Sequence, residues 1–476
     1  MCLAANISTR NILNNFPMTW KFWIGFIFTS GLLLGAWYFY WATRSGSLDS
    51  LTDLSNILPV SEEMQGDLKA VIKIAEHFLD TDGEEKVFLV LFQNNMELRP
   101  GGGFIGSFGI LKVKDGSVTE FSSHDVINFD GRIPDTVPAP YPMRETLGVK
   151  SLKLRDSNVS PDWAVNAKAA EDFYHMGEGK EQFDGVIGIT THVLSSFLSV
   201  TGPVEVPGYP GEYDAETGVL DLEYQVEQAF YKQGIERGDR KQVMHDLGNI
   251  ILAKAKELSF PKKYELFKVV LDDLHKKDIQ IMFKDEALQE TVRASGWSGE
   301  LDQAWDKDYF LLVDSNLNAL KSDYRMRRSI DYTVDLRSTP AKVTAAVTYE
   351  HTAKEKDYMT RDYQTFARLY VPEASWLERV DGPFKPAVFG SELEKKYFGA
   401  LVHVPLGTTK KVTWEYHLPE TLSADEYDLK IEKQAGVNDV PVTVTILRSS
   451  GTEKHQFKLN RPFVLSEAGS DTLVED

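Results

Sequence analysis

The fold of this chain depends on one stretch, which reads QNNMELRPGGGFIGS and occupies residues 93–107. It follows Val87–Phe92, an unbroken apolar run with the length and composition of a buried strand. Phe104–Val113 continues as a second extended segment, and the consecutive glycines before it let the backbone turn sharply. The stretch therefore predicts two strands joined by a tight, glycine-rich turn.

The chemistry of this turn has two interpretations. Arg99 supplies a planar guanidinium that matches phosphate or carboxylate oxygens, and the N–H groups of Gly101, Gly102 and Gly103 are free to approach a ligand closely. In this interpretation the turn is the floor of an anion site. In the other it is a bare turn with a capping arginine, although no turn type demands an arginine there. The sequence leaves both interpretations open.

The N-terminal part predicts one membrane span. Phe22–Ala42 carries no charge and is close to the about 20 residues that a helix needs to cross a bilayer. Tryptophans and tyrosines gather at both ends, where such rings sit at headgroup level. A cleaved signal peptide is the alternative, but the run is long for one and bulky aromatics occupy the place of small cleavage residues. We expect an uncleaved transmembrane helix over 22–42 in the lipid bilayer, and its Gly31 and Gly35 pair would let two copies pack as a homodimer.

Charge sets the orientation of this span. Residues 1–21 contain Arg10 and Lys21 and no acidic residue, so the positive-inside rule keeps this short N-terminus in the cytoplasm. Everything after Ala42 then lies outside the cell membrane. The sequence therefore predicts a single-pass protein of the cell envelope with its bulk extracytoplasmic.

Composition excludes several classes of function. The formal net charge is −19 at pH 7, so the chain lacks the basic footprint of non-specific nucleic-acid binding, and we expect no nucleic-acid partner. The single cysteine, Cys2, lies on the predicted cytoplasmic side. The extracytoplasmic part therefore has no disulfide, no cysteine–zinc site and no cysteine nucleophile.

The rest of the chain divides into two domains and a tail. Residues 43–84 predict a juxtamembrane linker and helices. Residues 85–327 alternate apolar strands with helices, which predicts an α/β domain with a mixed sheet and flanking helices. Residues 328–461 hold short segments rich in valine, threonine and aromatic residues, a pattern typical of an all-β sandwich. We expect an acidic, disordered tail over 462–476.

Several elements of the α/β domain are expected at defined places. Val118–Ser122 returns as a third strand after the Asp115-Gly116 turn. Ser160-Pro161-Asp162 predicts a helix start, with Ser160 as the N-cap and proline at the first helical position. The remaining expected elements are a strand over Phe183–Ile189 and helices over Thr191–Val200, Leu222–Lys232, Lys241–Leu258, Pro261–His275 and Glu286–Arg293.

The sequence lacks the motifs of P-loop NTPases, zinc proteases, serine hydrolases and dinucleotide-binding folds. Arginines and aspartates at turns of the α/β domain remain. Asp125 and Asp130 follow the third strand and either share a divalent cation or act as loop caps. Arg155 opens the segment Arg155–Asn158, whose residue types also favour a helix-entry capping network.

The densest basic group of this acidic chain lies between two expected helices. It comprises Arg237, Asp239, Arg240 and Lys241. A solvated helix–helix turn explains it as well as an anion site does. The anion site gains support if Arg99 lies beside this turn in space.

The stretch at 93–107 resembles the hallmark of the bacterial family catalogued as domain of unknown function 4012. Arg155–Asn158 before the helix start, Phe183–Ile189 and Leu198–Val204 also resemble that family. The chain is identified as a member over roughly 85–440. Members are typically membrane-anchored surface proteins without an assigned activity, so the resemblance implies a location rather than a reaction.

The order of elements is also similar, more distantly, to the LytR-CpsA-Psr phosphotransferases, which move glycopolymers from a polyprenyl-pyrophosphate carrier onto the cell wall. Arg99 stands where that family has an arginine at its first strand pair, and Asp125 or Asp130 where it has an aspartate after the returning strand. The turn around Arg237 and Arg240 resembles its closing arginine-rich turn. After Arg99, however, the chain lacks the aspartate that helps that family hold magnesium.

This second resemblance implies roles for individual residues. The implied phosphate-binding residues are Arg99, Gly101, Gly102, Gly103, Arg155, Arg237 and Arg240. The implied catalytic acids are Asp125, Asp130 and Asp239, and Asp125 and Asp130 are also the implied ligands of Mg²⁺. The expected function is binding of a polyprenyl-pyrophosphate-linked glycopolymer and its transfer to an envelope acceptor. The alternative is a non-catalytic cell-surface scaffold or adhesion protein, in which Arg99, Arg237 and Arg240 do not converge on one apolar cleft.

Overall fold

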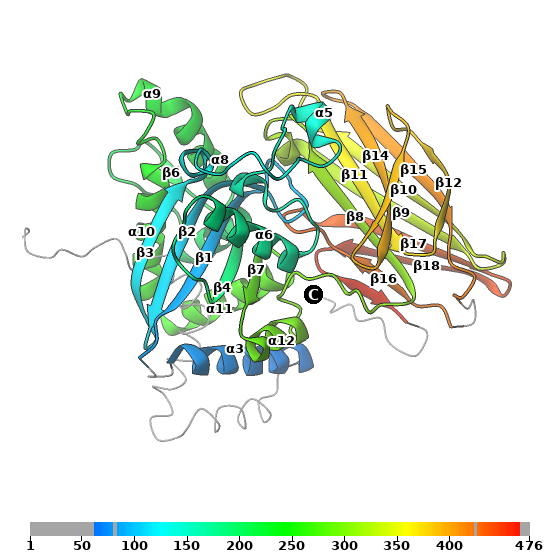
Figure 1. Ribbon diagram of the computed structural model, residues 1–476, viewed down its shortest axis with the longest axis horizontal. Helices are drawn as coiled ribbons and strands as arrows, with labels where there is room; N and C mark the ends of the chain where they lie inside the picture. The colour runs from blue at the N-terminus through cyan, green and yellow to red at the C-terminus, as the bar shows by residue number, and fades with distance from the viewer. Residues whose placement is uncertain (1–60, 80–82, 423–425, 467–476) are drawn as a thin grey trace, which may run out of the picture.

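The structure is a computed structural model that describes residues 61–79, 83–422 and 426–466 (Figure 1). The predicted span over 22–42 and the cytoplasmic segment 1–21 lie outside these residues. Among the residues that the structure describes, no helix is both long and apolar enough to cross a membrane.

Five strands form the sheet of the α/β domain, in the order β3-β2-β1-β4-β7 (Figure 1). β1 and β4 run parallel, whereas the other neighbouring pairs are antiparallel. The mixed sheet predicted from the sequence is therefore confirmed. The strands are β1 (Lys86–Asn94), β2 (Phe104–Lys114), β3 (Ser117–Asp125), β4 (Gly185–Thr190) and β7 (Ile279–Phe283).

Helices cover both faces of this sheet. Phe88 and Val90 of β1 pack in one core with side chains of α3, α7, α10, α11 and α12, while Leu89 and Leu91 pack in a second core with α4 and α6. Because β1 is buried on both faces, it reads as an unbroken apolar run and not as an alternating one. The helices are α3 (Glu62–Leu79), α4 (Val126–Asp130), α6 (Trp163–Met176), α7 (His192–Thr201), α10 (Gln242–Glu257), α11 (Phe260–His275) and α12 (Glu286–Ala294).

Two six-stranded sheets form the C-terminal sandwich, in the orders β12-β15-β10-β9-β17-β18 and β13-β14-β11-β8-β16-β19. One continuous apolar core lies between them, which confirms the predicted β-rich C-terminal region. The strands are β8 (Asp308–Asn316), β9 (Met326–Asp335), β10 (Lys342–His351), β11 (Tyr363–Pro372), β12 (Trp376–Asp381), β13 (Val388–Glu392), β14 (Lys395–Val404), β15 (Thr409–His417), β16 (Leu429–Glu432), β17 (Val440–Arg448), β18 (Gly451–Leu459) and β19 (Phe463–Leu465).

Three expectations about boundaries are corrected. The sandwich begins at β8, before the predicted boundary at residue 328, because β8 pairs with β11 and β16. β8 is buried almost throughout, so its sequence shows no alternation to mark it as a sandwich strand. The predicted tail begins too early, since β19 pairs with β16. Helix α6 begins at Trp163 with Asp162 and not Ser160 as its N-cap, since the Asp162 carboxylate accepts from Val165 N at 3.1 Å.

The glycine-rich turn joins the two domains. We call the segment Asn95–Gly103 the clasp. Leu98, in its middle, is 1% exposed and packs in the core of the sandwich. The Leu98 N–H donates to Asp323 Oδ2 at 3.0 Å, and its carbonyl accepts from Asn316 N at 3.0 Å. The chain thus leaves the α/β sheet, inserts one residue into the other domain and returns as β2.

Contacts on either side of Leu98 complete the clasp. Arg99 Nη1 donates to the Asn316 carbonyl at 3.2 Å, and the Arg99 carbonyl accepts from Gln434 Nε2 at 3.1 Å. Asn95 Nδ2 donates to the Gly436 carbonyl at 3.0 Å. The clasp is therefore bound by the end of β8, by the β8–β9 connection and by the segment that follows β16.

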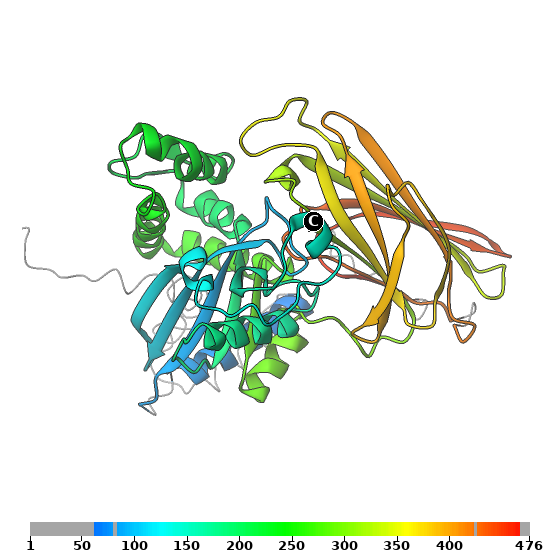
Figure 2. The ribbon, with the colours of Figure 1, turned by 45° about the horizontal axis from the view of Figure 1, so that its top comes forward.

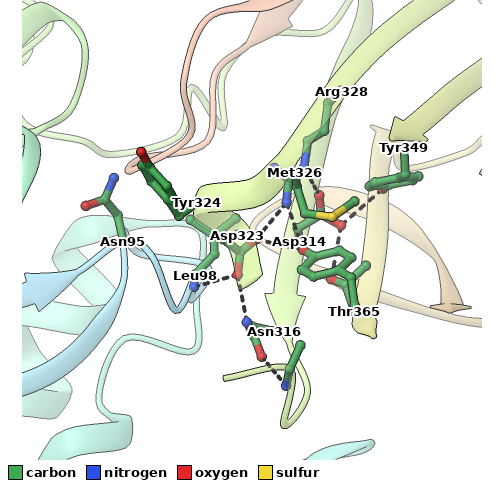
Figure 3. Close-up of polar contacts among 12 residues, drawn as sticks. Asn95, Leu98, Asp314, Asn316, Asp323, Tyr324, Met326, Arg328, Tyr349 and Thr365 are labelled. Atoms are coloured by element: carbon green, nitrogen blue, oxygen red, sulfur yellow. Dashed lines mark hydrogen bonds and ion pairs between the residues drawn. The ribbon is translucent and has the colours of Figure 1, made fainter. Parts of the chain in front are cut away.

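Asp323, which accepts from the Leu98 N–H, belongs to a buried charged network (Figure 3). Arg328 Nη2 donates to Asp323 Oδ1 at 2.8 Å, and Arg328 Nε donates to Asp314 Oδ2 at 2.7 Å. Tyr349 and Thr365 also donate to Asp314, each at 3.1 Å. Removing one member of such a buried pair typically costs about 3–5 kcal/mol, so Asp323 is held firmly in place.

Glycine is required where the clasp meets the sandwich. A Cβ at Gly436 would lie 2.1 Å from the Gly102 carbonyl oxygen, and the φ of Gly436 is +74°. Inside the clasp, a Cβ at Gly103 would lie 2.4 Å from the backbone of Asn94. Close backbone approach therefore accounts for glycines on both sides of the interface.

Replacing Gly436 by alanine should destabilise the chain more than the same change at Gly148. Both residues have a positive φ, but a Cβ at Gly148 meets open space. The φ strain alone costs about 1–2 kcal/mol, and overpacking at Gly436 adds about 1–3 kcal/mol. Urea denaturation of both variants, followed by tryptophan fluorescence, measures the difference. Equal losses would contradict the close contact between Gly436 and the clasp.

Candidate functional site

A cavity of about 380 Å³ lies at the carboxyl ends of the parallel strands β1 and β4. Phe92, Gln93 and Asn94 line it from β1, and Ile189 and Thr190 line it from β4. In open α/β sheets, ligands bind in the crevice beyond the carboxyl ends of the strands. The volume falls within the range of about 300–1,000 Å³ that is usual for small-molecule sites.

The walls of the cavity are mostly apolar. Helix α7 contributes Val193, Leu194 and Phe197, and the opposite side contributes Val219, Leu222 and Val226. These side chains recur at helical spacing, so each helix turns one apolar face toward the cavity. The enclosed surface therefore favours a hydrocarbon over a polar metabolite.

Helices cover the cavity from above the sheet edge. We call Gly218–Glu257 the lid; it consists of α8 (Gly218–Tyr224), the π-helical turn η3 (Gln225–Ala229), α9 (Phe230–Lys232) and α10. Figure 2 shows it on the side of the α/β domain away from the sandwich. The two helical arms match the helices predicted over 222–232 and 241–258. π-Helical turns are rare and frequently mark functional sites.

Three basic and three acidic side chains also line the cavity: Glu97, Glu223, Glu227, Arg240, Lys241 and Lys321. Arg240 Nη1 lies 3.0 Å from Glu227 Oε2, and Lys321 pairs with Glu223 and, at 3.5 Å, with Glu227. These pairs form one chain of alternating charges. The polar part of the cavity is therefore charge-balanced.

Lys321 reaches the cavity from the other domain. It lies on the β8–β9 connection, and its side chain is 17% exposed. The same connection holds Asp323, and Asn316 ends β8 just before it; both residues bind the clasp. The clasp therefore positions a sandwich residue in the wall of an α/β cavity.

Asp125 lies beside the cavity but already has partners. Lys241 Nζ lies 2.5 Å from Asp125 Oδ2, and the Ile127 N–H donates to Asp125 Oδ1 at 2.8 Å at the start of α4. Burial alone would raise the pKa of this carboxyl, but the hydrogen bond and charge of Lys241 hold the pKa below its usual value. Asp125 therefore acts as a helix cap and an ion-pair partner.

Asp130 faces a different partner. It is 2% exposed and accepts from Arg155 Nε at 2.5 Å and from the Leu154 N–H at 3.0 Å. Burial raises the pKa of Asp130, although the Arg155 charge opposes that rise. Arg155 is therefore an ion-pair partner of Asp130, while the helix-entry cap is made by Asp162; whether Arg155 binds phosphate stays a prediction.

The structure gives Arg99 and the glycines structural partners. Arg99 is 7% exposed and its guanidinium also bonds Glu97 Oε1 at 2.8 Å. The N–H groups of Gly101 and Gly102 donate to the Asn158 and Arg99 carbonyls, at 3.1 and 3.0 Å, so no cradle of free N–H groups remains. Gly103 N likewise donates to Gln93 Oε1 at 3.4 Å. The predicted anion cradle is corrected to an interdomain clasp.

The predicted site residues do not converge on one cleft. Arg240 lines the cavity, whereas Arg237 and Asp239 are exposed on the turn between α9 and α10, and Arg99 lies in the clasp. Within the described ranges, no group of three or more His, Cys, Asp or Glu side chains is placed to hold a metal. Asp125 pairs with Lys241 and Asp130 pairs with Arg155, so the two carboxylates do not fit as joint ligands of Mg²⁺.

Sequence reasoning missed several cavity residues. Lys321 and Glu223 come from distant segments that carry no motif, so no local signal pointed to them, and Glu97 lies within the stretch 93–107 but was not predicted as a site residue. The apolar positions of α7 and the lid were visible as helical periodicity, but periodicity alone does not distinguish a cavity wall from a packed core.

Comparisons with known proteins address the family more than the function. A family model described as "Protein of unknown function (DUF4012)" matches residues 82–226, which supports the predicted resemblance for that part of the chain. No curated protein matches the chain. Among solved structures, the Lin1025 protein from Listeria innocua is 16% identical, with a TM-score of 0.25, over 45% of this chain and 78% of that one. Aminopeptidase A from Legionella pneumophila in complex with aspartic acid is 11% identical, with a TM-score of 0.20, over 30% and 21%.

The Asp125–Lys241 pair should contribute stability that depends on pH. Asp125→Asn keeps the helix cap, because asparagine caps as well as aspartate, and removes only the charge. Since the pKa of Asp125 is lowered on folding, the contribution is present above 3.8 and is lost as pH falls through the folded pKa.

A double-mutant cycle of Asp125→Asn and Lys241→Met tests this pair. At pH 7 the expected coupling is up to about 1 kcal/mol, because both side chains are partly exposed. The coupling should vanish in strong acid. A coupling that is independent of pH would show that the two charges do not interact.

Proposed function

We propose that this protein binds the hydrocarbon chain of a membrane-borne lipid in the cavity under the lid, with an anionic head group at Arg240 and Lys241. The observation that carries the proposal is the apolar wall formed by α7 and the lid at the carboxyl ends of β1 and β4. Each CH₂ group buried against such a wall contributes about 0.8 kcal/mol, so even a short chain gains substantial affinity.

Two cations of the charge-balanced lining, Arg240 and Lys241, suit an anionic head group. Arg240 and Lys241 are 16% and 23% exposed, so a ligand oxygen has access to both. A phosphate would exchange places with Glu227 and Asp125 and take over their hydrogen bonds. Before binding, these carboxylates keep the two cations from being buried without partners.

A polyprenyl-pyrophosphate-linked glycopolymer combines the required parts. Its branched hydrocarbon chain matches the apolar wall, its phosphates match the two cations, and its polymer would stay in solvent outside the lid. The resemblance in element order that we expect from the sequence, to the LytR-CpsA-Psr phosphotransferases, implies the same ligand class. The proposal includes the extracytoplasmic location at the cell membrane, which rests on the sequence of residues 22–42.

The proposal is binding and not transfer of the polymer. Asp125 and Asp130 would supply the base or the magnesium ligands, but Lys241 and Arg155 already neutralise them. A metal-assisted phosphoryl transfer needs free carboxylates that meet at one ion. In residues 61–79, 83–422 and 426–466, no group of three or more His, Cys, Asp or Glu side chains is placed to hold a metal.

Binding of a fluorescent short-chain polyprenyl pyrophosphate to the full chain in amphipol tests the proposal. Leu194→Trp fills the cavity and should weaken binding at least tenfold, whereas Ser199→Trp, on the exposed side of the same helix, should leave it unchanged. Arg240→Ala should weaken binding about tenfold, since a charge-assisted hydrogen bond contributes about 1.5–3 kcal/mol. Magnesium should have no effect.

Two outcomes would overturn the proposal. One is the absence of saturable binding by the wild-type chain. The other is equal binding by Leu194→Trp and Ser199→Trp, since the ligand would then lie outside the cavity. Either outcome would favour a non-catalytic surface scaffold. Arg99→Ala is expected to lower stability through the clasp and to leave the affinity of the folded fraction unchanged.

A further inference from the structure

We infer that Lys321 and Tyr358 of the sandwich form a latch that holds part of the lid closed over the cavity, and that release of this latch controls exchange of the bound hydrocarbon chain. The inference rests on the proposed function, since it assigns a control to the same cavity. We call the part of the lid that the latch holds the outer arm, Gly218–Lys232, which comprises α8, η3 and α9. The grounds for the inference are the packing of this arm, its contacts with the sandwich and the rigidity of the surface that it contacts.

The outer arm packs loosely against its own domain. Val226 is the one large apolar side chain that is buried in this arm, which the structure describes throughout. Segments with few buried apolar contacts open at a low cost in free energy. The arm can therefore leave the cavity while the other helix of the lid keeps its place in the core. That helix, α10, buries four large apolar side chains: Val243, Leu247, Ile251 and Leu252.

The outer arm forms one body that carries a wall of the cavity. Gln225 Nε2 donates to Gln233 Oε1 at 2.7 Å, and Gln233 Nε2 donates to Gln225 Oε1 at 2.8 Å, so η3 is tied to the residue that follows α9. Val219, Leu222 and Val226 of the arm line the cavity. Movement of the arm therefore opens the apolar side of the cavity.

Two kinds of contact join the outer arm to the sandwich. Lys321 Nζ pairs with Glu223 and, at 3.5 Å, with Glu227. The ring of Tyr224 lies edge-on to the ring of Tyr358, with 6.1 Å between the ring centroids. Because Lys321 is mostly buried, its ion pairs lie in a lower dielectric than that of water and are stronger for it. Lys321 and Tyr358 therefore supply the arm with contacts that its own domain does not provide.

The two latch residues belong to one rigid surface of the sandwich. The Lys321 N–H donates to the Met359 carbonyl at 2.8 Å, and Leu320 forms a β-bridge with Thr360. Met359 and Thr360 are buried, so the backbone next to Tyr358 is fixed to the sandwich and does not follow the arm. The β8–β9 connection, which holds Lys321, also binds the clasp. The latch is therefore attached to the surface that sets the position of the two domains.

The labelling rate of a cavity-facing cysteine measures the opening of the arm without any lipid. In the full chain in amphipol, Cys2→Ser removes the only cysteine, and Leu222→Cys places a thiol on the cavity side of the arm. The rate at which a maleimide labels this thiol should rise at least tenfold in Lys321→Met and in Glu223→Gln. These two changes alter the charge of the cavity in opposite directions, so an increase in both reports loss of the latch and not a change in charge.

Two further variants test the aromatic contact and the position of the latch. Tyr358→Ala removes the ring on the sandwich side and should raise the labelling rate at least threefold. Lys385→Met repeats the Lys321 change on the exposed β12–β13 loop of the sandwich and should leave the rate unchanged. Labelling in Lys321→Met and Glu223→Gln that is no faster than in Lys385→Met would overturn the inference.

A covalent link across the latch tests its control of exchange. Tyr224→Cys and Tyr358→Cys in the Cys2→Ser chain place two thiols at the contact between the rings, where a flexible bis-maleimide joins them. The linked chain should release the fluorescent polyprenyl pyrophosphate at least tenfold more slowly than the same chain treated with a monofunctional maleimide. Equal release rates would contradict control of exchange by the latch.

The two readouts distinguish failure of the latch from failure of lipid binding. If the wild-type chain binds the fluorescent polyprenyl pyrophosphate but no latch variant changes the labelling rate, the latch is refuted and the lipid site stands. If the latch variants accelerate labelling but the wild-type chain binds no probe, the lipid site is refuted and the latch stands as a control of access to the cavity.

Discussion

The insertion of Leu98 into the core of the sandwich is the contact on which the rest of the structure depends. Its backbone bonds to Asp323 and Asn316 connect the end of β1 to the β8–β9 connection. Because Arg328 holds Asp323 in a buried network, the clasp meets a rigid surface and not a mobile loop. The relative position of the two domains is therefore set within a few residues of the sheet edge where the cavity lies.

Because of this arrangement, both domains contribute residues to the walls of the cavity. The α/β domain supplies the apolar face of α7 and the lid, and the sandwich supplies Lys321, which closes a chain of ion pairs with the lid through Glu223 and Glu227. Asn94, at the end of β1, also donates to Glu223 at 3.2 Å. If the lid opened, Glu223 and Glu227 would lose their contacts with Asn94 and Lys321 at the same time. The position of the lid is therefore coupled to the packing of the two domains. On the apolar side, α7 makes none of these ion pairs. A lipid chain could therefore enter while α7 and the sheet stay in place.

Much of this fold is predictable from the sequence because local signals are strong. The apolar run of β1 and the periodicity of α10 and α11 appear where expected, and the segments rich in valine, threonine and aromatic residues mark the β-rich C-terminal region. The role of Arg99 was not predictable, because a buried arginine that bonds backbone carbonyls has the same sequence as one that binds a phosphate. The glycines beside Arg99 are equally ambiguous. Glycine lets either a ligand or another backbone segment come close, and only the fold shows that this partner is Gly436. Lys321 carried no signal at all, since its place in the cavity depends on how the domains meet.

The central claim is that the cavity under the lid holds a lipid chain, and the most direct measurement is mass spectrometry of an organic extract from the purified full chain. The account predicts a co-purified lipid with a long hydrocarbon chain in stoichiometric amount, retained by Ser199→Trp and lost from Leu194→Trp. An extract of the wild-type chain without such a lipid, or the same amount in Leu194→Trp as in Ser199→Trp, would contradict it.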